Sequence, residues 1–511
     1  MKSLRELLVV KTVDTSNYLL SYARDPNTGY SEIILESKTA GHHRARHDSV
    51  DILDDHGALI YTAKIDEKIA HFVLDNFNVF GDTQSFRIFQ SDLHLGFASN
   101  RDDLTVNPLE VRHQLTEQEK SFTANGAKLV YHKSIFNKYA QTGFGSIIRA
   151  TLTNHQVCAS NCQFCSTISR NRKDSITLQE AKDFVDQLYF DQAEYNRKFF
   201  PEFNEAYKKE TGSDIRLRGL ILSGGGQPNL WPHFTEFVDY LSSLDISLGL
   251  ITNGFPQKVP EYIYKKFEWI RISITPESAS PFYPGGRFDK QYMPQTIKHN
   301  SDITVGYSYV FGPWTNDGIL NRIASSIEEN GFQYCRTLTD CNLTRNAQLK
   351  AHRDLAERLF KLNHIDEKGN PVGKIFHQLK YHGSKLEAEN LWDDGQCFLQ
   401  TYNLFWDTTG HEENGYSYCY PCDSVTVLAE IDTDGSVNAS ERKFNPEKWG
   451  TVKNTEVSRL FTEQVKPFFD PRKICTSCLF MKNNQMVKDL VNKPNNQLFS
   501  EFQSLEHINF P

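Results

Sequence analysis

Residues 146–363 alternate short apolar runs with amphipathic segments about six times, and this rhythm limits the folds open to the chain. The apolar runs have the length of buried strands, and the amphipathic segments are long enough to be helices. Strands that are joined through helices lie parallel to one another. The pattern therefore predicts an α/β fold, as an open or closed barrel. In such folds the functional residues follow the carboxyl ends of the strands.

The expected elements can be assigned to ranges of the sequence. Strands are predicted at 146–153, 216–228, 246–254, 269–275, 302–313 and 332–339. Helices are predicted at 176–190, 233–244, 259–267, 319–331 and 347–362. The first of these helices places Leu178, Ala181, Phe184, Val185 and Leu188 on one face, as packing against a sheet requires. A charged segment at 193–214 interrupts the rhythm, and we predict a surface insertion or lid there.

The length of the chain, 511 residues, corresponds to about three domains. Residues 1–140 contain short alternating runs, polar turns and no cysteine, which predicts a β-rich N-terminal domain of unknown role. Residues 141–363 form the α/β core. Residues 364–511 form a smaller cysteine-rich domain and tail, with a β-hairpin at 426–440 around an Asp-Gly turn.

Composition restricts the class of protein. Hydrophobic residues make up 39% of the chain and charged residues 23%, as in a soluble globular protein. No run approaches the ~20 apolar residues of a membrane helix, and we expect no signal peptide. We therefore expect a cytoplasmic protein with no membrane partner. The net charge of −8 argues against a nucleic-acid partner. In a reducing cytosol the ten cysteines indicate metal or catalytic sites rather than disulfides.

Three cysteines directly follow the first predicted strand of the core. Cys158, Cys162 and Cys165 have the spacing CxxxCxxC. A loop can wrap such thiolates around an iron-sulfur cluster, and three ligands leave one iron of a four-iron cluster open. An open metal position is what a reactive site needs. A structural zinc site, or buried thiols without a metal, is the alternative interpretation.

This motif resembles the signature of the radical S-adenosylmethionine superfamily, in which an aromatic residue, here Phe164, usually precedes the last cysteine. The resemblance implies a partial (β/α)6 TIM-like barrel and a catalytic [4Fe-4S] cluster. It also implies that S-adenosylmethionine binds the open iron through its amino and carboxylate groups. One electron then cleaves this cofactor to methionine and a 5′-deoxyadenosyl radical, which abstracts a hydrogen atom from the substrate. An electron donor such as flavodoxin or ferredoxin is implied as a partner.

Further motifs match the same superfamily at the ends of later strands. Gly224, Gly225, Gly226 and Gln227 occupy the place of a GGEP-like motif that contacts the cofactor, with Gln in place of the usual Glu. Glycines at such a place permit close approach of the backbone. The sequence ITNG at 251–254 resembles a third-strand motif. The sequence ISIT at 272–275 matches the fourth strand, where members of the superfamily carry polar side chains that face the cofactor, and the candidates on this strand or just after it are Ser273, Thr275 and Glu277.

A second group of cysteines lies in the C-terminal region. Cys419 and Cys422 form one CxxC pair, and Cys475 and Cys478 form another. Four thiolates complete a metal site, which is either a structural zinc ribbon or a cluster site. Within the superfamily the arrangement resembles a SPASM/twitch extension, which implies one auxiliary [4Fe-4S] cluster. Cys397 is an alternative ligand. The remaining cysteines, Cys335 and Cys341, are expected to be unliganded thiols.

The resemblance leads to a functional hypothesis. We expect a radical S-adenosylmethionine enzyme that oxidises, cross-links or epimerises a peptide, a protein or a small natural-product molecule. A zinc-stabilised α/β binding protein is one alternative. A radical enzyme that modifies nucleic acid is another, although the short basic segments of the chain do not establish the basic patch it needs.

Overall fold

The computed structural model describes residues 8–14, 18–24, 31–37, 44–47, 49–53, 59–64, 87–89, 117–123, 126–165, 167, 170–254, 259–275, 293–340, 345–366, 371–377, 383–384, 397–408, 412, 418–420, 427–431, 437–442, 452–453, 457–465, 477–478, 480–492 and 505–511. The chain divides into two compact units, Met1–His113 and Gln114–Pro511. No helix among the described residues is long and apolar enough to cross a membrane.

The N-terminal unit is built from strands, as predicted. Four of them form an antiparallel sheet in chain order: β1 (Leu8–Asp14), β2 (Tyr18–Arg24), β3 (Ser31–Ser37) and β4 (Arg44–His47). In a second sheet, β5 (Ser49–Leu53) lies between β6 (Leu59–Lys64) and β7 (Arg87–Phe89). The larger unit already begins at Gln114. Three helical elements that precede the first predicted strand therefore belong to this larger unit. They are α3 (Glu117–Phe122), the 3-10 helix η3 (Ala127–His132) and α4 (Lys133–Thr142).

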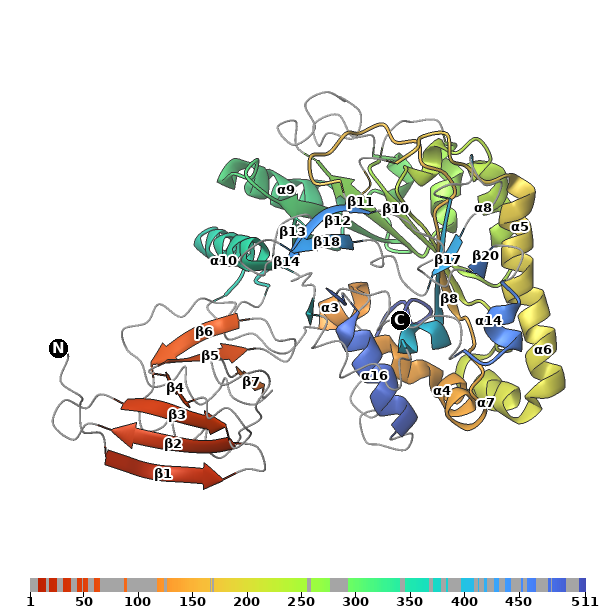
Figure 1. The fold of residues 1–511 in the computed structure, drawn as a ribbon. Coiled ribbons are helices and arrows are strands. Elements are labelled where there is room, and N and C mark those ends of the chain that lie inside the picture. Colours follow the sequence, from red (N-terminus) through yellow and green to blue (C-terminus); the bar gives the residue numbers. More distant parts are fainter. Residues whose placement is uncertain are drawn as a thin grey trace. The chain divides into compact units, whose positions relative to one another are not determined.

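One sheet of ten strands organises the larger unit (Figure 1). Its order is β14-β13-β12-β11-β10-β9-β8-β16-β17-β20, and the eight strands from β14 to β16 are parallel. The six central parallel strands are those that the sequence predicted: β8 (Arg149–Leu152), β9 (Gly219–Leu222), β10 (Ser247–Thr252), β11 (Trp269–Ile274), β12 (Thr304–Phe311) and β13 (Tyr334–Thr339). The α/β fold with a partial, TIM-like barrel is confirmed.

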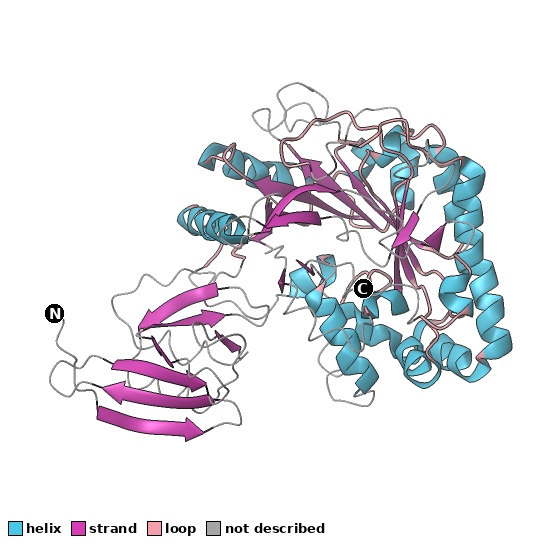
Figure 2. Cartoon of the chain, viewed as in Figure 1, coloured by secondary structure: helices cyan, strands magenta, loops and turns pink. Residues whose placement is uncertain are grey.

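Helices flank the parallel strands (Figure 2). They are α5 (Leu178–Asp186), α8 (Phe234–Ser242), α9 (Asp317–Asn330) and α10 (Arg345–Lys361). The Thr177 side chain and Glu180 form a capping box that fixes the start of α5. Gly331, with φ 68°, ends α9 in the left-handed conformation that glycine tolerates best. The helix expected at 259–267 is instead the 3-10 helix η6 (Glu261–Lys266), because little chain separates Pro260 from β11.

Residues beyond 363 complete the sheet rather than forming a separate unit. β14 (Ile375–His377) lies beside β13, and β16 (Asn403–Asp407) runs parallel to β8. The sheet then continues antiparallel through β17 (Tyr418–Tyr420) and β20 (Val452–Lys453). The predicted hairpin is present as β18 (Val427–Ile431) and β19 (Val437–Arg442).

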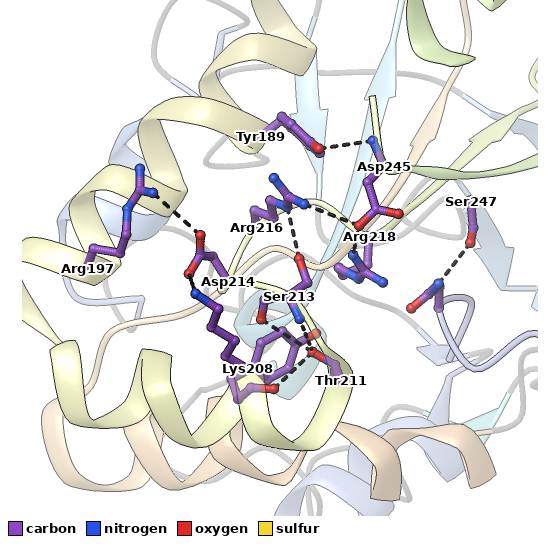
Figure 3. Close-up of polar contacts among 12 residues, drawn as sticks. Tyr189, Arg197, Lys208, Thr211, Ser213, Asp214, Arg216, Arg218, Asp245 and Ser247 are labelled. Carbon is purple, nitrogen blue, oxygen red and sulfur yellow. Dashed lines mark hydrogen bonds and ion pairs between the residues drawn. The ribbon is translucent and has the colours of Figure 1, made fainter. Parts of the chain in front are cut away.

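The insertion at 193–214 is not a lid. It forms α6 (Gln192–Phe199) and α7 (Pro201–Thr211), and α7 leads directly into the start of β9. The buried Tyr207 of α7 packs in one apolar cluster with residues of α4. Figure 3 shows that polar contacts fix the loop that follows α7. Asp214 pairs with Arg197 and Lys208, and Asp245 accepts from Arg218 at 2.7 Å. The insertion therefore supports the amino ends of the strands, opposite the expected site.

The segment 505–511 closes the same end of the sheet. His507 is hydrogen-bonded to Glu268 before β11 and to Thr304 at the start of β12. Asn509 donates to Ser247 at the start of β10. Arg149, the first residue of β8, donates to the carbonyl oxygen of Pro511 at 2.8 Å. This segment thus contacts residues at or next to the starts of four parallel strands.

Candidate functional site

The cysteine loop, which we define as residues 153–165, follows the carboxyl end of β8. Later strands contact it at their own carboxyl ends. Asn253, just after β10, donates to the hydroxyl of Ser160 at 3.0 Å and lies 3.9 Å from the Cys158 sulfur. The hydroxyl of Thr275, just after β11, lies 3.5 Å from the Cys162 sulfur. The structure therefore brings residues from distant parts of the sequence to the place where the barrel geometry predicted chemistry.

The segment Gly224–Gln227 lies directly against the cysteine loop. The Gln227 backbone N–H donates to the carbonyl oxygen of Val157 at 2.7 Å, and Nε2 of the His155 ring donates to the Gln227 carbonyl oxygen at 2.7 Å. A Cβ atom on Gly226 would lie 2.7 Å from the Val157 carbonyl oxygen and closer still to that of His155. Glycine is therefore required at position 226 because the segment after β9 packs closely against the cysteine loop. The sequence alone does not reveal this reason.

Gln227 is the clearest candidate contact for a bound molecule. Its side chain is only 2% exposed, and neither atom of its amide group has a hydrogen-bond partner in the described part of the chain. The hydroxyl of Thr153, at the carboxyl end of β8, is also buried without a partner there. Buried polar groups are normally paired, because leaving one unpaired costs about 1–3 kcal/mol. Gln227 beside the cysteine loop and Thr153 within it thus fit a site that a polar ligand completes.

The three thiols of the cysteine loop differ in their electrostatic surroundings. Burial raises the pKa of Cys158, and it raises the pKa of Cys162 to about 12. Burial also acts against ionisation of Cys165, but the charge of Arg170 and hydrogen bonds from Thr167 and Arg170 outweigh it and lower the pKa of this thiol. Metal ligation requires thiolates, so loading the site with a metal releases protons.

No three His, Cys, Asp or Glu side chains in the described ranges are placed to hold one metal ion. Cys158, Cys162 and Cys165 are each partly exposed and close enough for their charges to interact. A mononuclear site needs ligands that converge on one point, whereas a four-iron cluster can accept each thiolate on a different iron. Three thiolates on one loop fit a four-iron cluster in which one iron keeps an open position.

Two features of the site were not anticipated from the sequence. Phe164 packs against Trp314, which follows β12, with ring centroids 5.3 Å apart. Gln156 of the cysteine loop donates to the Asp407 carboxylate at 3.0 Å, at the end of β16. No local pattern signals either contact, because each joins segments far apart in the chain. Asn253, in contrast, lies in the ITNG motif that the sequence had already marked.

The remaining predicted residues are placed only in part. Ser273 lies on β11, two residues before Thr275 and on the same face of the strand. Cys419 lies in β17, and Cys478 lies in β21 (Ser477–Cys478), which pairs with β15 (Gly383–Ser384). The other candidates fall outside the described residues: Glu277, Cys341, Cys422 and Cys475.

The two other cysteines with described side chains are buried thiols. Cys397 belongs to an apolar cluster, and its sulfur lies 3.7 Å from the Asn484 side-chain oxygen. Burial strongly raises the pKa of Cys335 on β13. In these surroundings both side chains act as small apolar groups.

Neither a protein-family model nor a curated protein matches this chain. Solved structures with similar folds were found. SuiB of Streptococcus suis, bound to S-adenosylmethionine, is 12% identical, and the match covers 73% of this chain and 79% of SuiB with a TM-score of 0.40. The anSMEcpe structure, with bound AdoMet and a Cp18Cys peptide, is 14% identical over 68% of this chain and 99% of that chain, with a TM-score of 0.33. BtrN in complex with AdoMet and 2-DOIA is 9% identical over 70% of this chain and 92% of BtrN, with a TM-score of 0.26.

Proposed function

We propose that this chain is a radical S-adenosylmethionine enzyme. Cys158, Cys162 and Cys165 would hold a [4Fe-4S] cluster with one iron open to the cofactor. The observation that carries the proposal is the contact of the cysteine loop with Asn253 and Thr275 at the carboxyl ends of a partial barrel. When bound, the cluster and S-adenosylmethionine supply a 5′-deoxyadenosyl radical for abstraction of a hydrogen atom from the substrate.

The residues around the cysteine loop position it and complete the cofactor site. The backbone of Gln227 ties the loop to the end of β9, and its buried amide is available to a polar ligand. The side chain of Asn253 fixes Ser160 within the loop. We propose that Gly224, Gly225, Gly226, Gln227, Ser273 and Thr275 line the S-adenosylmethionine site.

We further propose that the C-terminal region contributes to turnover of the substrate through an auxiliary [4Fe-4S] cluster. Cys419 pairs with Trp406 in the sheet, and the neighbouring Asp407 binds Gln156 of the cysteine loop. This connection supports a place for Cys419 near the cysteine loop, and we propose Cys422, Cys475 and Cys478 as the other ligands of the auxiliary cluster. The proposed reaction is oxidation, cross-linking or epimerisation of a peptide, a protein or a small natural product. The proposed electron donor is a cytoplasmic flavodoxin or ferredoxin.

The first test is metal content combined with cofactor cleavage. Protein that is reconstituted without oxygen should hold about eight irons, and replacing Cys158, Cys162 and Cys165 together by Ala should leave about four. The variant should form no 5′-deoxyadenosine from S-adenosylmethionine and a reductant. Cys335→Ala, which removes a buried thiol elsewhere on the sheet, is the matched control and should keep the full iron content.

Two results would contradict the proposal. One is zinc in place of iron and sulfide in the wild-type protein, which would favour a zinc-stabilised binding protein. The other is cleavage of S-adenosylmethionine at the wild-type rate by the triple variant.

A further inference from the structure

Arg170 is attached to the cysteine loop at several points. Its Nε donates to the carbonyl oxygen of Gln156 at 3.0 Å, and its Nη1 donates to the carbonyl oxygen of Thr167 at 2.7 Å. The same Nη1 lies 3.2 Å from the sulfur of Cys165 and donates to it. The two contacts with carbonyl oxygens fix the guanidinium group, so its positive charge is held next to the sulfur of Cys165.

The effect of Arg170 falls unequally on the three cysteines. Cys165 receives a hydrogen bond from the guanidinium group and lies 3.4 Å from the hydroxyl of Thr167. Cys158 accepts a backbone N–H from Ser160, and Cys162 lies beside the Thr275 hydroxyl, but among the described residues no charged group donates a hydrogen bond to either sulfur. Of the three sulfurs, Cys165 is therefore the one to which a fixed cation donates.

A cation in this place matters most when the cluster changes charge. Reduction adds one negative charge to an iron-sulfur cluster, and part of that charge resides on the ligand sulfurs. Hydrogen bonds to those sulfurs and nearby positive charge stabilise the reduced form more than the oxidised form. The effect is strong where water is partly excluded, because charges interact more strongly in a low dielectric.

We propose that Arg170 is a positioning residue that raises the reduction potential of the cluster through its contact with Cys165. The proposal rests on the proposed function, because it requires a cluster on the cysteine loop. The couple is a one-electron reduction of the cluster by an external electron donor. No covalent bond forms or breaks in this step, and Arg170 keeps its protons throughout.

The test is a redox titration of the reconstituted protein followed by electron paramagnetic resonance. The signal that is absent from the triple Cys→Ala variant identifies the catalytic cluster. Arg170→Gln keeps a polar side chain but removes the charge, and it should make reduction about tenfold less favourable, which corresponds to about 59 mV for one electron. Arg170→Lys restores the charge and should recover most of the loss.

Arg172, two residues after Arg170, supplies a matched control. Its guanidinium group donates to the backbone carbonyl of Cys158 at 3.2 Å, and the side chain is exposed. Because solvent and salt screen an exposed charge, Arg172→Gln should change the reduction equilibrium by less than about threefold.

Three outcomes would overturn the proposal. Arg170→Gln could hold its cluster at the wild-type potential, or Arg172→Gln could shift the potential as much as Arg170→Gln does. Loss of the cluster from Arg170→Gln would assign the residue to holding the loop rather than to setting the potential. A wild-type protein that assembles no cluster would instead contradict the proposed function, so the two failures are distinguishable.

Discussion

Single residues at the site are constrained by contacts within the chain as much as by any ligand. Gly226 shows this most clearly, because its missing side chain allows the segment that follows β9 to lie against the carbonyl groups of the cysteine loop. A sequence motif identifies such a glycine, but it does not show which atoms of the folded chain lie close to that glycine. The contact partners, His155 and Val157, lie in another loop, and only the folded chain brings the two together.

Replacing Gly226 with Ala should therefore damage the cluster site. The added Cβ atom must displace backbone atoms, and forced overpacking of this kind costs about 1–3 kcal/mol. We expect the variant to hold fewer irons at the catalytic site after reconstitution and to bind S-adenosylmethionine more weakly. Iron analysis and equilibrium binding measure the two effects.

Gly373 provides the comparison, because a Cβ atom there would meet nothing within 4 Å. Gly373→Ala should keep the wild-type iron content and stability. Normal cluster loading in Gly226→Ala would show that the close approach to the cysteine loop is not required.

A helix or strand was predictable from the sequence where its own residues show a clear hydrophobic pattern. The six central strands were found because each is a short apolar run next to an amphipathic segment. β14 and β16 were missed, since β14 spans only Ile375–His377 and β16 finds its partner β8 far away in the sequence. The segment at 193–214 is a surface insertion, as one of the two predicted alternatives, but its many charged residues hide the buried face of α7, where Asn204 and Tyr207 pack, so the sequence did not exclude a lid.

A further prediction concerns the C-terminal cysteines, which we propose as ligands of the auxiliary cluster. Replacing Cys475 and Cys478 by Ala should remove about four irons and stop product formation, while slow cleavage of S-adenosylmethionine continues. The reason is that cleavage needs an iron with an open position, which a cluster with four thiolates lacks. Iron analysis, 5′-deoxyadenosine formation and substrate turnover measure these effects separately.

The fold of this variant must be checked, because losing a metal site can remove several kcal/mol of folding free energy. Circular dichroism of the variant beside the wild type provides that control. A folded variant with about four irons that still makes product at the normal rate would exclude a role for the auxiliary cluster in turnover.

At the scale of the whole molecule, His132 links segments that are far apart in sequence. Its Nε2 donates to the carbonyl oxygen of Ile508 at 2.8 Å, so Nδ1 of the neutral ring accepts from the hydroxyl of Tyr207 at 2.8 Å. Burial lowers the pKa of His132 from 6.5 to about 4. Between these two values the unfolded chain binds more protons than the folded chain, so stability falls as the pH falls.

The pH dependence of unfolding tests this link. The wild type should lose about 3 kcal/mol of unfolding free energy through His132 as the pH falls from 6.5 to 4. His132→Gln should be less stable than the wild type at pH 7 but should lose less stability on acidification, as measured by urea unfolding. His233→Gln, at an exposed position, should keep the wild-type slope. An equal loss in His132→Gln and the wild type would contradict the assignment.

The bond between Gln156 and Asp407 has a consequence for the order of events during synthesis. The two residues are 251 positions apart, so the ribosome makes the cysteine loop long before it makes the strand that secures it. At about 10 residues per second the delay is about 25 seconds. During this time the thiols of the nascent chain lack that support, so we expect the proposed cluster to be inserted after translation rather than during it.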